Sequence, residues 1–103
     1  MEKLYIVIWG SGSCDDHYNA HAYANVHGIY KSEASAMKAL EDCKQEIYDE
    51  VLTDLDPDGE VPNVEDEVQI YGSIEEKHFE IDYTLGTEPV EIYVTMVEKE
   101  IQE

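Results

Sequence analysis

A stretch of twelve residues has the spacing of a calcium-binding loop. From Asp54 to Glu65 the chain reads DLDPDGEVPNVE, which matches the pattern D-x-[DN]-x-[DN]-G-x5-E. Oxygens at loop positions 1, 3, 5, 7 and 12 surround the ion in such loops, and glycine at position 6 permits the sharp turn. The stretch predicts a calcium site, although Pro62 stands beside a ligand position and residues 68–72 indicate a strand where an exiting helix is usual. The ligands of this predicted site are Asp54, Asp56, Asp58, Glu60 and Glu65.

Cysteine and histidine residues form a second group that could do chemistry. Cys14, His17 and His21 have Cys-x2-His and His-x3-His spacings that are compatible with zinc, and His27 and Cys43 follow. On a helix His17 and His21 could bind one ion, but on a strand they would lie about 13 Å apart. We prefer a strand here, and therefore polar histidines on a strand face. A Cys–His nucleophile is disfavoured as well, because neighbouring carboxylates raise the pKa of a thiol.

Glycine and serine alternate in Gly10-Ser11-Gly12-Ser13, after a short apolar run. A phosphate-binding loop would continue with Gly-Lys-[Ser/Thr], whereas here Asp15 and Asp16 follow almost at once. We therefore predict a hairpin loop at residues 10–13. Because no group of residues indicates catalysis, the sequence predicts a protein that is not an enzyme.

The charge of the chain excludes several kinds of ligand. Its 103 residues carry a formal net charge of −19, from 25 Asp and Glu against six Lys and no Arg. Binding to nucleic-acid phosphates requires Lys and Arg that displace counterions, so direct binding to DNA or RNA is excluded. Anionic membranes and nucleotide substrates are disfavoured for the same reason. Self-repulsion of this size destabilises a compact fold, which favours a use for the charge: a positive partner, a metal ion or a halophilic solvent shell.

Nearly half of the carboxylates lie between residues 41 and 67, where twelve stand beside one lysine, Lys44. Three of them, at positions 49, 50 and 54, fall near the end of a predicted helix, where each is unfavourable by roughly 0.3–1 kcal/mol. Solubility alone needs a net charge of only about 2–8 in a small domain, so we predict a binding surface here, with a solvated face as the alternative. The predicted partner-binding residues are Glu41, Asp42, Glu46, Asp49, Glu50, Asp54, Asp56, Asp58, Glu60, Glu65 and Asp66, with Tyr48 as an aromatic anchor.

The elements that must position these residues follow from periodicity. Apolar residues recur at steps of three and four behind a potential N-cap, Ser32, and predict a helix to about Asp54. Its inward residues are Ala36, Met37, Leu40, Cys43, Ile47, Val51 and Leu55. A loop with two prolines follows.

Alternating or apolar runs predict strands at 5–9, 17–30, 68–73, 78–85 and 90–96, with a helix over 15–24 as the alternative for the second. The inward residues of the last two strands are Phe79, Ile81, Tyr83, Leu85, Val90, Ile92, Val94 and Met96. The order predicts a single α+β domain over residues 1–103, of ββαβββ order, with one amphipathic helix on a mainly antiparallel sheet.

The apolar run near the N-terminus is too short for a signal sequence or a membrane span. Two cysteines without such a signal are typical of reduced thiols, so we expect a cytoplasmic protein.

In size, charge and the mixture of Tyr with Asp and Glu, the chain resembles the small acidic inhibitors that phages encode against host-defence nucleases, namely DNA-mimic and anti-CRISPR proteins. This resemblance is one of composition over the whole chain. It implies a non-enzymatic viral inhibitor, acting in the host cytoplasm, whose carboxylates take the place of DNA phosphates in the basic groove of a target such as a CRISPR effector. It implies no cofactor. The alternatives are a calcium-binding module and an accessory protein whose charge serves solubility.

Overall fold

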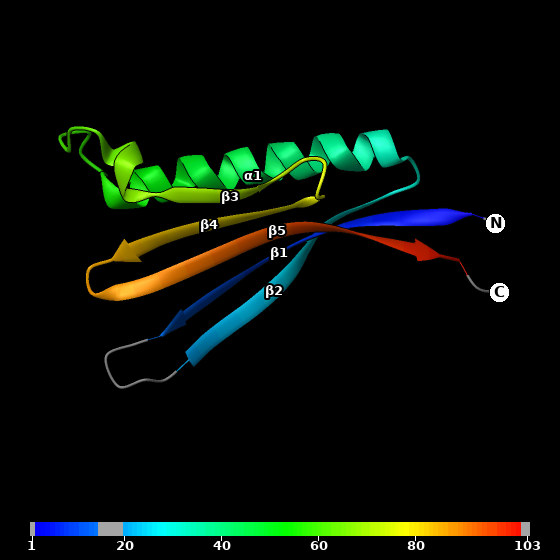
Figure 1. The fold of residues 1–103 in the computed structure, drawn as a ribbon, viewed down its shortest axis with the longest axis horizontal. Coiled ribbons are helices and arrows are strands. Elements are labelled where there is room, and N and C mark those ends of the chain that lie inside the picture. Colours follow the sequence, from blue (N-terminus) through cyan, green and yellow to red (C-terminus); the bar gives the residue numbers. More distant parts are fainter. Residues whose placement is uncertain (1, 15–19, 102–103) are drawn as a thin grey trace.

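A computed structural model describes residues 2–14 and 20–101, which form five strands, one α-helix and one short 3-10 helix (Figure 1). The elements are β1 (Lys3–Cys14), β2 (Ala20–Tyr30), α1 (Glu33–Leu55), η1 (Val64–Glu67), β3 (Gln69–Ser73), β4 (His78–Leu85) and β5 (Glu88–Glu100). The predicted single α+β domain of ββαβββ order is thereby confirmed.

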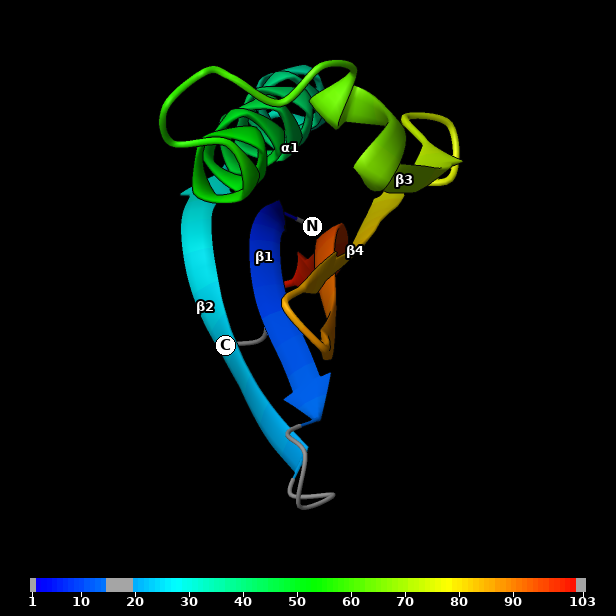
Figure 2. The same ribbon diagram turned by 90° about the vertical axis from the view of Figure 1, so that its left-hand side faces the viewer.

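The strands form one antiparallel sheet in the order β2-β1-β5-β4-β3. β4 and β5 are joined by a two-residue turn at Gly86 and Thr87, and Gly86 has a φ of 66°, which a residue without Cβ adopts at little cost. The helix α1 lies over one face of the curved sheet (Figure 2) and contacts β1, β2, β4 and β5. We call this the covered face, and the other the open face.

Local sequence signals set both ends of α1. The Ser32 side-chain oxygen accepts a hydrogen bond from the backbone N–H of Ser35 at 3.3 Å, as the predicted N-cap should. At the other end the backbone N–H of Asp56 donates to the carbonyl of Leu52 at 3.0 Å. The predicted helix is therefore confirmed nearly to the residue.

The core between α1 and the sheet is apolar, and no polar or charged residue is buried in the described part of the chain. One cluster gathers around Val7, Leu40 and Val94, and a second around Val51 and Ile81. Trp9 packs against both clusters. The periodicity predicted most of this core, including all four inward residues of β5, but it missed Ala39.

Two sequence predictions for the strands are wrong. Residues 10–13 are not a loop, because β1 continues through them to Cys14. The ring of Tyr93 on β5 covers Gly10, where a Cβ would overlap it, so a neighbouring strand provides the packing that glycine lacks. Leu85 does not point into the core; it is 48% exposed at the end of β4, beyond the cover of α1.

The alternation predicted for the second strand holds only in part. The pairing of β1 with β2 shifts between Val7 and Ile8, so that Val7 pairs with Gly28 and Ile8 with Val26. His27 is the extra residue of this bulge, and the two faces of β2 exchange parity there. Residues 15–19 of the predicted strand lie outside the described part of the chain.

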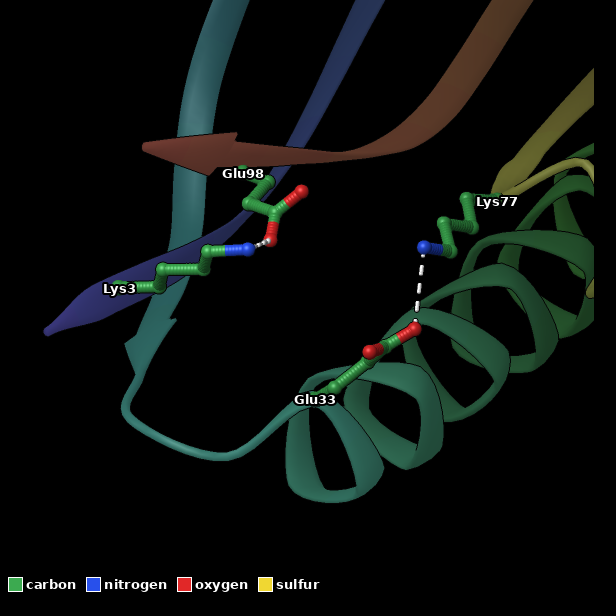
Figure 3. A network of polar contacts seen from close by, with 4 residues as sticks. All are labelled: Lys3, Glu33, Lys77 and Glu98. Carbon is green, nitrogen blue, oxygen red and sulfur yellow. Dashed lines mark ion pairs between the residues drawn. The ribbon is translucent and has the colours of Figure 1, made fainter. Parts of the chain in front are cut away.

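Two ion pairs hold one end of the molecule together (Figure 3). Lys77, in the turn between β3 and β4, contacts Glu33 in the first turn of α1 at 3.0 Å. Lys3 on β1 contacts Glu98 on β5, also at 3.0 Å. Among residues 2–14 and 20–101, no helix is both long enough and apolar enough to cross a membrane.

Candidate protein-binding surface and neighbouring pocket

The six carboxylates that α1 carries between positions 41 and 54 are all exposed to solvent. We call them the helix carboxylates: Glu41, Asp42, Glu46, Asp49, Glu50 and Asp54. At about 1.5 Å of rise per residue they span about 20 Å of helix, with a mean axial spacing of about 3.9 Å between successive charges. One strand of DNA carries a phosphate per about 3.4 Å. The linear charge density of the helix is therefore slightly below that of a single nucleic-acid strand.

Nothing basic at the end of α1 compensates this charge. The last turn of the helix contains no Lys, Arg or His, although a cation is favoured there. Lys44 lies within the acidic stretch, but its ammonium nitrogen is 5.2 Å from the centre of the Phe79 ring, on the side facing the sheet. The cation is thus held by a cation–π contact away from the exposed carboxylates.

Tyr48, the predicted aromatic anchor, is only half exposed. Its ring packs against the second core cluster, beside Val51 and Leu52. The residue therefore supports the helix, and only part of its side chain faces solvent.

The five predicted calcium ligands, at the end of α1 and in the segment after it, do not converge in this structure. Among the described residues, the five predicted ligands form no group of three whose oxygens lie within 4.8 Å of one another. Asp54 still belongs to α1, and Asp56 Oδ1 accepts hydrogen bonds from the backbone N–H groups of Glu60 at 2.8 Å and Val61 at 3.2 Å. The exiting element is the four-residue η1, followed by β3. Asp58, Glu60, Glu65 and Asp66 are exposed, and Asp56 is half-buried.

A pocket of about 160 Å³ lies between the C-terminal half of α1 and the covered face of the sheet. Trp9 from β1 and Tyr83 from β4 contribute aromatic surface, and Val51 supplies apolar surface from the core. Two exposed helix carboxylates, Glu50 and Asp54, form its charged edge. We call this the Trp9 pocket. Both carboxylates are among the predicted partner-binding residues, but no pattern in the sequence predicts that they lie beside Trp9.

Three carboxylates meet on the open face of the sheet. Glu80 and Asp82 of β4 and Glu91 of β5 place their oxygens within 4.8 Å of one another. We call them the sheet carboxylates. Burial and the neighbouring charges of Glu80 and Glu91 raise the pKa of Asp82, and its Oδ1 atom is buried without a hydrogen-bond partner. Carboxylates in such a group could hold a cation.

A hollow of about 340 Å³ adjoins the sheet carboxylates, where Asp66 and Glu67 of η1 come near Asp82 and Glu91. Of the predicted partner-binding residues, Asp66 therefore faces a different surface from the helix carboxylates. The acidic stretch of the sequence is divided between two surfaces.

The predicted zinc group stays a prediction, because the side chains of Cys14, His17 and His21 lie outside the described part of the chain. Cys43 is a free, buried thiol in α1. Burial and the nearby charge of Glu46 raise its pKa to about 11, so that it is protonated at neutral pH and a poor nucleophile.

Comparisons of the chain with protein families, with curated proteins and with solved structures found no match.

Proposed function

We propose that this chain is a non-enzymatic inhibitor that binds the basic groove of a nucleic-acid-binding protein and excludes the nucleic acid from it. A nuclease of host defence, such as a CRISPR effector, is the target class that the chain's composition favours. The observation that carries the proposal is the exposed set of helix carboxylates, whose mean axial spacing of about 3.9 Å is near the phosphate spacing of about 3.4 Å in one nucleic-acid strand.

The arrangement of the lysines supports this proposal. Lys3 and Lys77 are paired with carboxylates at the opposite end of the fold, and Lys44 is held over Phe79. Since α1 has only two lysines, Lys38 and Lys44, the six helix carboxylates give it a net negative potential, which steers a positive partner and makes its association fast and sensitive to salt.

The test is capture of partners from a host lysate on the immobilised chain. We expect a nucleic-acid-binding protein to be retained, to be released as salt rises, and to be displaced by duplex DNA, since inhibitor and DNA would share one groove. The triple variant Asp49→Lys, Glu50→Lys and Asp54→Lys should lose at least 100-fold in affinity.

A matched control is the variant Glu75→Lys, Glu76→Lys and Glu100→Lys, which changes the net charge equally at exposed positions away from the outer face of α1. It should retain capture. Equal loss in both variants would mean that total charge matters and the helix row does not. A captured protein that still binds duplex DNA would contradict mimicry.

A further inference from the structure

We propose that the Trp9 pocket binds the guanidinium group of one arginine side chain. The inference rests on the proposed function for the source of that arginine, which is the basic partner. It goes beyond a set of surface charges because it assigns one anchoring residue of the partner to one partly open pocket.

The charge of the pocket selects a cation. Glu50 and Asp54 are four residues apart, so their side chains lie on neighbouring turns of one side of α1, and both line the pocket. The pocket also adjoins the last turn of α1, where the macrodipole is negative and no basic residue of the chain is present. Two carboxylates and a helix C-terminus therefore act on the same small space.

The aromatic lining selects arginine over lysine. Trp9 and Tyr83 line the pocket from two different strands. A guanidinium is planar, stacks on aromatic faces and donates several hydrogen bonds to carboxylates, whereas an ammonium is a compact and strongly hydrated point charge. The ring surfaces would contact the plane of the guanidinium while its N–H groups donate to Glu50 and Asp54.

The size of the pocket fits a single planar group. Its volume of about 160 Å³ is close to that of a cavity that takes benzene, roughly 150 Å³, and far below the roughly 300–1,000 Å³ of sites for drug-sized ligands. The small side chain of Ser11 is part of the lining on β1 and leaves this space open.

The chain cannot occupy the pocket with its own arginine, because it has none. The lysine nearest in sequence to Glu50 is Lys44, and its ammonium lies over Phe79. An arginine in the pocket must therefore come from another molecule.

The pocket contains a built-in reporter, since Trp9 is the single tryptophan of the chain. We would titrate the protein with arginine amide and follow Trp9 fluorescence, with citrulline amide as the matched probe that lacks the guanidinium charge. We expect a saturable change with arginine amide in the millimolar range and none with citrulline amide. Lysine amide should bind more weakly.

Two double variants make the test specific. Glu50→Gln with Asp54→Asn should lower the affinity for arginine amide about tenfold or more. Glu75→Gln with Glu76→Gln removes the same charge from exposed positions outside both the pocket lining and the helix carboxylates and should bind as the parent does. Circular dichroism would verify that both variants fold.

The pocket assignment is overturned if arginine amide gives no saturable change in Trp9 fluorescence or in amide NMR shifts, or if both double variants respond equally. These outcomes are separable from those of the capture experiment. Arginine binding without any captured partner would refute the proposed function alone. Capture that needs the helix carboxylates but is equal in the two double variants would refute the pocket alone.

Discussion

The helix carboxylates and the sheet carboxylates are the same chemical groups, but α1 keeps them apart and the sheet brings them together. Along α1 the six groups are all exposed, and no three of them bring their oxygens within 4.8 Å. On β4 and β5, three groups converge within that distance, and the pKa of Asp82 is raised by burial and by its two neighbours. Helical rotation spreads adjacent charges over a solvated cylinder, whereas strand pairing sets them side by side.

This difference separates two uses of negative charge. Spread carboxylates keep a long-range field that a positive partner can reach, and they cost the fold most where the helix dipole is unfavourable, near the end of α1. Converging carboxylates repel one another at close range, so that neutralising one of them stabilises the fold. The comparison therefore predicts that charge removal has different effects in the two regions.

The largest effect is expected from reversing charge at the end of α1. The variant Asp49→Lys, Glu50→Lys and Asp54→Lys should gain about 1 kcal/mol or more of unfolding free energy, since Asp54 in the last turn contributes roughly 0.3–1 kcal/mol through the helix dipole and all three replacements reduce the self-repulsion of the chain. Urea denaturation at low ionic strength measures this gain. The variant Glu75→Lys, Glu76→Lys and Glu100→Lys changes the net charge equally, away from the end of the helix, so it should gain less unfolding free energy. Equal gains would show that the helix dipole does not contribute.

A smaller effect is expected from Asp82→Asn. Because the pKa of Asp82 is raised in the folded protein, ionisation of this group is less favourable there than in the unfolded chain. The cost is absent below the unfolded pKa and complete above the folded one. The variant should therefore gain about 0.2–1 kcal/mol at pH 7, with the gain vanishing as the pH falls to about 3.

The control for this prediction is Asp42→Asn, which removes one exposed helix carboxylate. The unfolding free energy that this variant gains over the parent at pH 7 should be smaller than the gain of Asp82→Asn. If its pH profile followed that of Asp82→Asn, the contrast between converging and spread carboxylates would be wrong.

The smallest effect is expected from Lys77→Gln, which removes the ion pair with Glu33. The hydrogen bond and the charge of Glu33 raise the pKa of Lys77, so the pair stabilises the fold below the usual lysine pKa and is lost as pH rises through the folded value, above 10.5. Thermal melts should show a slightly lower midpoint for the variant, with a difference that shrinks in 1 M salt. Lys31→Gln is the matched control; a salt-independent difference would contradict the ion-pair account.

Sequence reasoning succeeded where the deciding interactions are local. Apolar periodicity and the Ser32 cap gave α1, and alternation gave the inward face of β5. It failed at residues 10–13, because these residues pair with β2 on one side and with β5, some eighty residues later, on the other, and the ring of Tyr93 packs on Gly10. Only the folded chain brings that ring over Gly10.

The two acidic sites differ in whether the sequence alone could have predicted them. A two-residue turn at Gly86 and Thr87 pairs Asp82 with Glu91, so the sheet carboxylates were accessible from the hairpin register alone. The Trp9 pocket was not accessible in this way, because it depends on how α1 crosses β1, β4 and β5. No local pattern encodes that crossing.

The edge strand β2 gives the charge of the chain another consequence. From Ala20 to Tyr30 it contains no Asp, Glu or Lys, β1 is its one partner among the described strands, and Val26 and Ile29 are 59% and 60% exposed. Free edges of this kind are templates for strand-to-strand aggregation, which proteins often prevent with charges on the edge itself. Here the protection is collective: two copies that approach along β2 each bring a net charge of −19. We therefore expect copies to aggregate along β2 in concentrated salt or in acid, because both weaken that repulsion.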